Sequence, residues 1–209
     1  LSFLFPPICP LCAKELLDKG EHICKSCSKE QIFIKEPTCY SCGKPMKNHE
    51  KEYCSDCRQH PKNFERGMGL CIYQKPVTNS LAAIKYKNER KFAKYYLEEI
   101  QKRKYRDLLQ LKIDVIIPVP IHRKKRRKRG FNQAEIFANG IAEMLNKPMY
   151  TKIVERIHDT KPQKQLNPGE RKSNLKKAFR GNLKEYQRAG MPKRVLLVDD
   201  IYTTGSTAE

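Results

Sequence analysis

The sequence "VLLVDDIYTTGST", residues 195–207, places two acidic residues between an apolar strand and a short polar loop. Its four apolar residues predict a buried strand, and Asp199 and Asp200 follow at the carboxyl end, where open parallel sheets bind their ligands. Carboxylates accept hydrogen bonds from vicinal hydroxyls, while the loop offers backbone N–H groups and hydroxyls to a phosphate. The motif therefore predicts a sugar-phosphate site, although two acids before a Thr-rich turn also occur at an ordinary capped helix start.

Strands and helices alternate upstream of this motif. The strands are expected at 67–74, 112–120, 149–154 and 193–200, and the helices at 77–87, 89–111 and 131–146. In the last of these helices, Asn132 is the expected N-cap, with Glu135 three residues on. Its apolar face is expected to consist of Ala134, Phe137, Ala138, Ile141 and Leu145. This order is typical of an α/β protein with a parallel sheet.

The N-terminal part carries a regular series of cysteines. Eight of the nine form four CxxC pairs, each starting 15 residues after the last, which suggests a duplicated unit. These eight are Cys9, Cys12, Cys24, Cys27, Cys39, Cys42, Cys54 and Cys57. Two CxxC pairs together complete a tetrahedral zinc site of four thiolates with no open position, so we expect two structural Zn²⁺ ions. Pairing of consecutive motifs is preferred because it closes shorter loops, with interleaved pairing as the alternative; without a secretory signal, a disulfide scaffold is disfavoured.

A change of composition near residue 64 divides the chain. We expect a zinc-binding module at 1–63 and a second domain at 64–209, in which Cys71 is a small buried strand residue rather than a metal ligand. A strand and phosphate loop normally continue into a helix and a further strand. The second domain is therefore expected to be C-terminally incomplete.

The charge of the chain points to an anionic partner. Lys and Arg number 43 against 23 Asp and Glu, a formal net charge of +20. Seven of these cations are consecutive, at 123–129 in "HRKKRRKRG", and the plainest interpretation is a solvated loop. The alternatives are pyrophosphate contacts through Lys125, Arg127 and Arg129, or binding of single-stranded DNA with Phe131 stacked on a base. Without a membrane-length apolar run or a signal peptide, the protein is expected to be cytoplasmic.

The motif at 195–207 resembles the phosphoribosyl pyrophosphate signature of type I phosphoribosyltransferases, and the whole chain is similar to the ComF (ComFC) family of competence proteins. Besides the CxxC pairs, the shared segments are "CGKP" at 42–45, "IKY" at 84–86, "IPVPIH" at 117–122, "RGFNQAE" at 129–135, "TKPQ" at 160–163 and "ERKSNLKKAF" at 170–179. The resemblance implies a type I phosphoribosyltransferase-like parallel sheet with an N-terminal double zinc-ribbon module. It also implies a role in DNA uptake during natural transformation, together with proteins of the competence machinery. Arg126 departs from the pattern, because an apolar residue is expected there.

By this resemblance, Asp199 and Asp200 bind the ribose hydroxyls of phosphoribosyl pyrophosphate, with Mg²⁺ on the diphosphate. The residues implied for the 5′-phosphate are Thr203, Thr204, Gly205, Ser206 and Thr207. No residue identifies itself as a base or a nucleophile, so the catalytic residues and the acceptor stay unassigned. Two functions are therefore open: a phosphoribosyltransferase, or a non-catalytic module of the same fold that binds single-stranded DNA and proteins.

Overall fold

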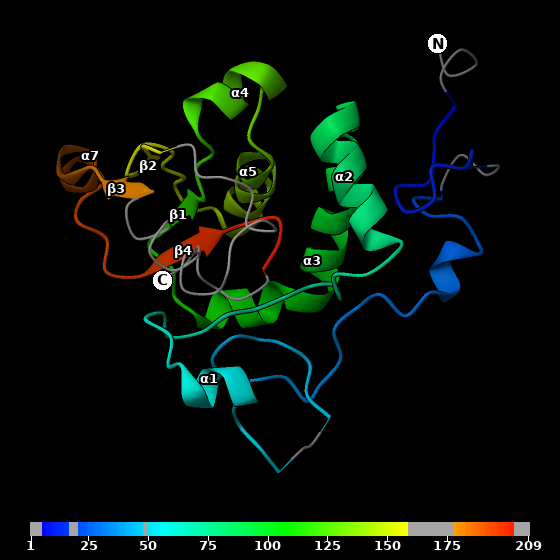
Figure 1. The fold of residues 1–209 in the computed structure, drawn as a ribbon, viewed down its shortest axis with the longest axis horizontal. Helices are drawn as coiled ribbons and strands as arrows, with labels where there is room; N and C mark the ends of the chain where they lie inside the picture. The colour runs from blue at the N-terminus through cyan, green and yellow to red at the C-terminus, as the bar shows by residue number, and fades with distance from the viewer. Residues whose placement is uncertain (1–5, 17–20, 48–49, 159–177, 203–209) are drawn as a thin grey trace. The chain divides into compact units, whose positions relative to one another are not determined.

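The computed structural model describes residues 6–16, 21–47, 50–158 and 178–202. The chain divides into two compact units, Leu1–Lys104 and Tyr105–Glu209, and we describe each by itself (Figure 1). The domain boundary expected near residue 63 lies inside the first unit, and as a limit between separately folding domains it stays a prediction. The loop expected to bind a 5′-phosphate, residues 203–207, falls outside the described residues.

The first unit begins with two ribbon segments that repeat at a spacing of 30 residues. In the first copy the backbone N–H of Cys9 donates to the carbonyl of Lys14, and in the second the N–H of Cys39 donates to that of Lys44, both at 2.8 Å. The last cysteine of each copy lies in a short helical turn, η1 (Cys27–Lys29) or α1 (Ser55–Gln59). The matching hydrogen bonds confirm the duplicated unit that the cysteine spacing predicts.

Two glycines bring the second ribbon against the chain that leaves it. Gly43 has a φ of +69°, and a Cβ placed there would lie 2.6 Å from the carbonyl oxygen of Gly67. A Cβ at Gly67 would lie 2.9 Å from the carbonyl oxygen of Cys42. The position of Gly43 in the first ribbon is occupied by Ala13, which has a φ of +60°. A side chain is therefore tolerated in the first knuckle but excluded from the second.

Two helices follow the ribbons, α2 (Val77–Lys87) and α3 (Phe92–Gln110), as the sequence predicts, and the last turns of α3, from Tyr105 on, belong to the second unit. Val77, Leu81 and Ile84 form the buried face of α2, and Asn88 ends this helix in the left-handed conformation, with a φ of +60°. The strand expected at 67–74 is wrong, because this segment forms a single antiparallel bridge, between Cys71 and Phe33. Its first residues are instead held by the close approach of Gly67 to the second ribbon.

A two-stranded parallel sheet forms the centre of the second unit. Strand β1 (Val115–Pro118) is buried throughout and pairs with β4 (Val195–Val198), with Val115 opposite Val195 and Pro118 opposite Val198. Helix α5 (Gln133–Leu145) packs against both strands. Both strands therefore point their carboxyl ends toward the same edge, as the sequence predicts. The larger sheet of a phosphoribosyltransferase-like fold stays a prediction.

The fold of α5 follows its predicted pattern. The side chain of Asn132 accepts a hydrogen bond from the backbone N–H of Ala134 and so caps the helix, as expected. All five predicted face residues are buried: Ala134, Phe137, Ala138, Ile141 and Leu145. Glu135 pairs with Arg126. The burial of this face confirms the predicted helix.

The prediction that β4 is a buried strand is wrong for half of its residues. Val195 and Leu197 are 43% and 38% exposed, whereas Val198 is buried. The register places Val195 and Leu197 on the same face as Val115 and Ile117 of β1. On that face Ile153 and its neighbours cover β1, and this cluster does not include β4.

The remaining elements of the second unit are short. Helix α4 (Arg123–Arg129) follows β1, and a small antiparallel pair joins β2 (Val154–Arg156) to β3 (Phe179–Gly181). Helix α7 (Leu183–Arg188) precedes β4. The strand expected at 149–154 is wrong in its extent, since only Met149 bridges to β1 and β2 begins at Val154. Among the described residues, no helix combines the length and apolar character that crossing a membrane requires.

Replacing Gly43 by Ala is expected to destabilise the first unit by about 2 kcal/mol or more. The left-handed conformation costs a residue with a Cβ about 1–2 kcal/mol, and the contact with Gly67 adds to this loss. Urea unfolding of the zinc-loaded protein, followed by circular dichroism, measures the effect.

Gly130→Ala is the matched control for this substitution. Gly130 has a φ of +82°, but a Cβ there would meet nothing within 4 Å. The control should therefore lose only the conformational part, about 1–2 kcal/mol. Equal losses for the two variants would contradict the close approach at Gly67.

Candidate functional site

The eight paired cysteines form two clusters of four. One consists of Cys9, Cys12, Cys24 and Cys27, and the other of Cys39, Cys42, Cys54 and Cys57. Within each cluster the sulfur atoms lie within 4.8 Å of one another, so the consecutive pairing preferred from the sequence is the one observed. The interleaved alternative is excluded by this grouping.

The sulfur spacing fits zinc. The Sγ atoms of Cys12 and Cys24 are 3.6 Å apart, and those of Cys42 and Cys54 are 3.7 Å apart. A tetrahedral ion with Zn–S bonds of about 2.3 Å separates its sulfurs by roughly 3.8 Å, whereas a disulfide requires about 2.05 Å. All nine cysteines are free thiols. Four thiolates would fill each zinc ion's coordination, so these sites suit a structural role rather than catalysis.

Hydrogen bonds lower the pKa of some of these thiols and so favour the thiolate form. The hydroxyl of Ser26, 3.1 Å from the sulfur, helps to lower the pKa of Cys24 to about 6. Burial opposes ionisation of Cys39, but backbone N–H groups, including that of Cys54 at 3.3 Å, lower its pKa to about 7. Burial raises the pKa of Cys42. A cation is therefore needed to hold all four sulfurs of a cluster ionised together.

Cys71 lies outside both clusters, as expected. Burial, reinforced by the charge of Glu99, raises its pKa to about 12. A thiol with so high a pKa is a poor nucleophile and a poor metal ligand at neutral pH. Cys71 is half-buried and its backbone forms the bridge to Phe33, so the expected buried strand residue is confirmed only in part.

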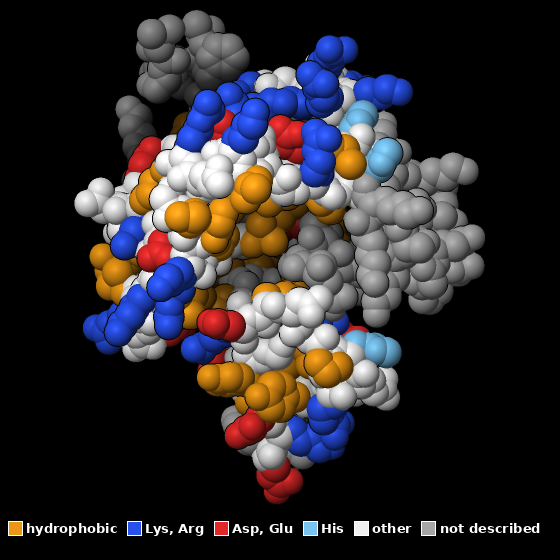
Figure 2. Space-filling model, turned by 90° about the vertical axis from the view of Figure 1, so that its left-hand side faces the viewer, with side chains coloured by type: hydrophobic (Ala, Val, Ile, Leu, Met, Phe, Trp, Pro, Cys, Tyr) orange, Lys and Arg blue, Asp and Glu red, His pale blue; other side chains and the backbone are white. Residues whose placement is uncertain are grey.

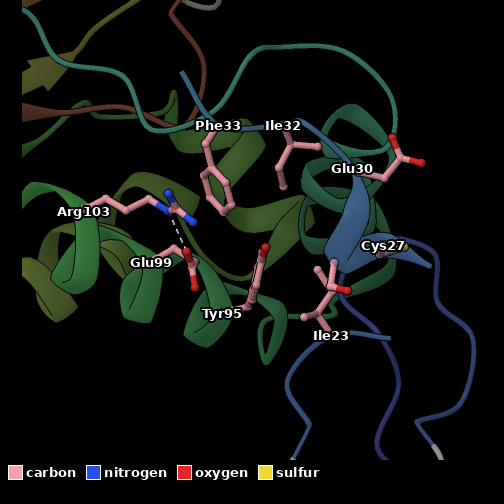
Figure 3. A pocket seen from close by; sticks show the side chains of 9 residues that line it. Ile23, Cys27, Glu30, Ile32, Phe33, Tyr95, Glu99 and Arg103 are labelled. Atoms are coloured by element: carbon pink, nitrogen blue, oxygen red, sulfur yellow. Dashed lines mark hydrogen bonds and ion pairs between the residues drawn. The ribbon is translucent and has the colours of Figure 1, made fainter. Parts of the chain in front are cut away.

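A pocket of about 140 Å³ lies where the first ribbon meets α3 (Figure 3). The ribbon side is lined by Ile23, Cys27, Ser28, Glu30, Ile32 and Phe33, and the helix side by Tyr95, Glu99 and Arg103. The guanidinium of Arg103 lies 3.7 Å from the centre of the Phe33 ring and donates to Glu99 Oε2 at 2.8 Å. Burial raises the pKa of Glu99, but Arg103 and Lys102 outweigh it and hold that pKa below its usual value. The polar groups are thus satisfied within the first unit, which indicates that they attach the ribbon to α3.

A second candidate site lies at the carboxyl end of the parallel sheet. Asp199 is exposed and accepts a hydrogen bond from the backbone N–H of Asp200 at 2.9 Å. The carboxylate of Asp200 accepts one from the side-chain amide of Gln133 at 3.3 Å. Gln133 is buried in the first turn of α5. Of the two acids predicted from the sequence, Asp200 therefore meets the N-terminus of α5, where a helix favours negative charge.

The buried side-chain amide of Asn132 holds the start of α5 at this end of the sheet. Asn132 donates from Nδ2 to the carbonyl of Val119 at 2.9 Å and accepts through Oδ1 from the N–H of Ala134. One side chain thus joins the end of β1 to the start of α5. Replacement of Asn132 would leave buried backbone groups without partners, which costs about 1–3 kcal/mol for each.

The basic run is solvent-exposed, as the plainest interpretation expects, but it forms a helix rather than a loop. His122 caps α4 through Nδ1, which accepts from the N–H of Lys124, and Gly130 ends it with a φ of +82°. No residue of α4 is buried, and Figure 2 shows Lys and Arg side chains gathered along the upper edge, where α4 lies in Figure 1. Cations in its last turn are favoured by the helix dipole, and the ion pair of Arg126 with Glu135 ties α4 to α5. Arg126 therefore has a polar role where the family pattern predicts an apolar residue.

The three cations proposed to contact pyrophosphate or DNA differ in exposure and in their partners. Arg129 donates to Oε1 of Gln133, the residue whose Nε2 donates to Asp200. Lys125 is half-buried and Arg127 is exposed. Through Arg129, a chain of hydrogen bonds thus runs from a cation through a neutral amide to a carboxylate.

Sequence reasoning missed Gln133 and misjudged Phe131. Gln133 directly follows the predicted N-cap within the segment "RGFNQAE", and this position could have identified it as a site residue. Phe131 is buried, so its predicted stacking on a base is wrong. Its ring contributes to packing at the start of α5 instead. The residues implied for the 5′-phosphate, Thr203, Thr204, Gly205, Ser206 and Thr207, lie outside the described residues.

Comparison with known proteins gives one family model and several relatives. Residues 1–58 match the family model of the double zinc ribbon domain. "Competence protein F" of Haemophilus influenzae is 39% identical over 99 residues, which are 47% of this chain and 42% of that protein. "DNA utilization protein YhgH" of Salmonella typhimurium is 34% identical over 115 residues, 55% of this chain and 48% of that protein. "Competence protein ComFC" of Bacillus subtilis is 30% identical over 93 residues, 44% of this chain and 34% of that protein.

These matches confirm the resemblance seen in the motifs. The chain is similar to proteins named competence protein F and ComFC, and its residues 1–58 match a double zinc ribbon. The matched segments span less than half the length of these three relatives. No solved structure matches the chain.

Metal analysis of the purified protein is expected to find two zinc ions per chain. Replacing a clustered cysteine, for example Cys42 by Ser, should remove one zinc ion and unfold its ribbon, because metal binding supplies several kcal/mol of folding free energy to such small segments. Circular dichroism together with metal analysis of each variant measures both effects.

Cys71→Ser is the matched control, since this cysteine lies outside both clusters. It should keep both zinc ions. A wild-type content of one zinc ion per chain would contradict the two-site structure, and so would the loss of an ion in the Cys71 variant.

Proposed function

We propose that the chain acts in DNA uptake and binds phosphoribosyl pyrophosphate at the carboxyl end of β1 and β4. The observation that carries the ligand proposal is the position of Asp199 and Asp200 directly after β4, with the Asp200 carboxylate oriented by buried Gln133. The names of the relatives, competence protein and DNA utilization protein, support the biological role.

In this proposal the two carboxylates accept hydrogen bonds from the ribose hydroxyls of the ligand. Residues 203–207 would hold the 5′-phosphate, and Mg²⁺ would enter with the diphosphate and offset its charge. Lys125, Arg127 and Arg129 follow β1 and would contact the pyrophosphate group from α4. Because Gln133 already satisfies one carboxylate oxygen of Asp200, the other acceptor positions of this carboxylate are the ones for the sugar.

Asp200→Asn is expected to weaken the binding of phosphoribosyl pyrophosphate by about 1–3 kcal/mol, because an acceptor for a ribose hydroxyl is lost. Calorimetry in the presence of Mg²⁺ measures this loss, and the Asp199/Asp200 double Asn variant should lose more. Pyrophosphate release in the same mixture, with and without DNA, would show a transferase, whereas binding without release would show a binding module.

Asp114→Asn is the matched control at the opposite end of the same strands. The Asp114 carboxylate accepts from the N–H groups of Lys193 and Arg194, at 2.9 and 2.8 Å, just before β4. This variant should bind the ligand as wild type does. Equal affinity in wild type and the double Asn variant would show that the acids take no part in binding.

The exposed cations of α4 support a second function, binding of single-stranded DNA. Seven consecutive Lys and Arg residues form this helix, none of them buried. A diphosphate needs two or three cations, and a polyanion makes use of more. Each phosphate contact on a single strand releases counterions and adds about −0.7 to the slope of log affinity against log salt concentration.

Replacing Arg123, Lys124 and Lys128 by Ala is therefore expected to make this slope shallower by about 2 if all three contact phosphates. Fluorescence anisotropy with a labelled oligonucleotide across a salt series measures the slope. Phosphoribosyl pyrophosphate binding should be kept, because Lys125, Arg127 and Arg129 are unchanged. A control variant with the same loss of charge replaces the exposed residues Lys147, Lys152 and Lys184. Equal slopes for the two triple variants would contradict DNA binding by α4.

A further inference from the structure

The large exposed apolar side chains differ in kind between the two units. Among the described residues of the first unit they are all tyrosines: Tyr40, Tyr53, Tyr73 and Tyr86, which are 60%, 39%, 51% and 75% exposed. In the described part of the second unit they are all aliphatic: Leu109, Ile157, Leu183, Met191, Val195 and Leu197. Exposed aromatic rings suit a planar partner, because each ring offers a face for stacking.

Two of these tyrosines form one cluster on the second ribbon. The rings of Tyr40 and Tyr53 meet edge to face, with centres 6.1 Å apart and an angle of 75° between their planes. The guanidinium of Arg66 lies 5.7 Å from the centre of the Tyr40 ring. An exposed ring beside a cation offers a stacking surface and a phosphate contact together.

A metal ion in the second cysteine cluster would hold these two rings in place. Tyr40 lies between Cys39 and Cys42 in one knuckle, and Tyr53 directly precedes Cys54 in the other. The backbone N–H of Tyr40 donates to the carbonyl of Glu52 at 2.8 Å, which joins the two knuckles. Because the backbone under both rings is already fixed, a ligand that stacks there orders few further groups.

The first ribbon shows that the ribbon fold does not require these rings. At the positions 30 residues earlier it carries Pro10, which is buried, and Ile23, which lines the pocket against α3. The turn at the first CxxC pair is closed by the same backbone hydrogen bonds in both ribbons, from Cys9 to Lys14 and from Cys39 to Lys44, although Pro10 has no N–H to match the bond of Tyr40 to Glu52. The tyrosines of the second ribbon therefore add something other than support for the metal site.

We propose that Tyr40, Tyr53 and Arg66 form a stacking site for the bases of single-stranded DNA on the second zinc ribbon. The inference rests on the proposed role in DNA handling and adds a base-binding site, distinct from the phosphate contacts of α4. The cation beside Tyr40 and the net charge of +20 favour a polyanion over a peptide as the occupant. Stacking is tolerant of sequence, since every base has a π-face.

The test uses the full chain and a short oligothymidylate. Tyr40→Ala is expected to weaken binding roughly 5- to 150-fold, the range that one base–aromatic stack contributes. Tyr40→Phe keeps the ring and should bind within about twofold of wild type. Since the chain has no Trp and 10 Tyr, quenching of tyrosine fluorescence by the stacked base gives a second readout.

Tyr73→Ala is the matched control, an exposed tyrosine of the same unit outside the cluster. It should bind as wild type does, and every variant should keep two zinc ions. Tyr40→Ala should leave the slope against salt unchanged, because no phosphate contact is lost. If the α4 variant flattens the slope while Tyr40→Ala binds as wild type, the stacking site is wrong and DNA binding by α4 stands. If wild type fails to bind the oligonucleotide, both are wrong.

Discussion

The convergence of four sulfurs on one point is the constraint on which the first unit depends. The described residues of its two ribbons form only short helical turns and single bridges, so few backbone hydrogen bonds hold them. Bringing four thiols within 4.8 Å is unfavourable once they ionise, and a divalent cation turns this repulsion into attraction. Bound metal would thereby help to hold the segments attached to the two clusters, among them the chain at Ile32 and Phe33 beside α3 and the close approach of Gly43 and Gly67.

In the second unit, a neutral side chain connects two groups of opposite charge. The amide of Gln133 presents an acceptor to Arg129 and a donor to Asp200, and its burial keeps water from replacing either contact. A charged residue at this position would repel one of the two neighbours. The amide therefore lets a basic helix and an acidic strand end share one edge of the sheet.

The sequence predicts those features that depend on local pattern. The CxxC spacing and the amphipathic helices at 77–87 and 131–146 give their elements correctly, and the strand expected at 112–120 is observed over Val115–Pro118. The basic run forms a helix rather than the expected loop, because repulsion among like charges is only one contribution to the free energy. Lys and Arg favour helices, and capping by His122 and Gly130 together with the ion pair to Glu135 outweighs the repulsion.

Other errors come from contacts between distant residues. The segment at 67–74 has the composition of a strand, but Gly67 is held against the second knuckle, and that contact cannot be read from either segment alone. Phe131 looks available beside the cations, yet the start of α5 buries it. The exposure of Val195 and Leu197 likewise depends on how far the Ile153 cluster extends over the sheet. Gln133 has no pattern of its own, because its importance lies in two partners that meet only in the folded chain.

If both proposed binding regions take their ligands, the path from Arg129 through Gln133 to Asp200 would link them thermodynamically. An anion on α4 relieves repulsion among its seven cations and so stabilises the helix whose last residue holds Gln133. A ligand that draws on the Asp200 carboxylate acts on the same amide from the other side. Any factor by which one ligand changes the affinity for the second must act equally in the reverse direction. Binding of nucleic acid would then change the affinity for the sugar phosphate, and binding of the sugar phosphate would change the affinity for nucleic acid.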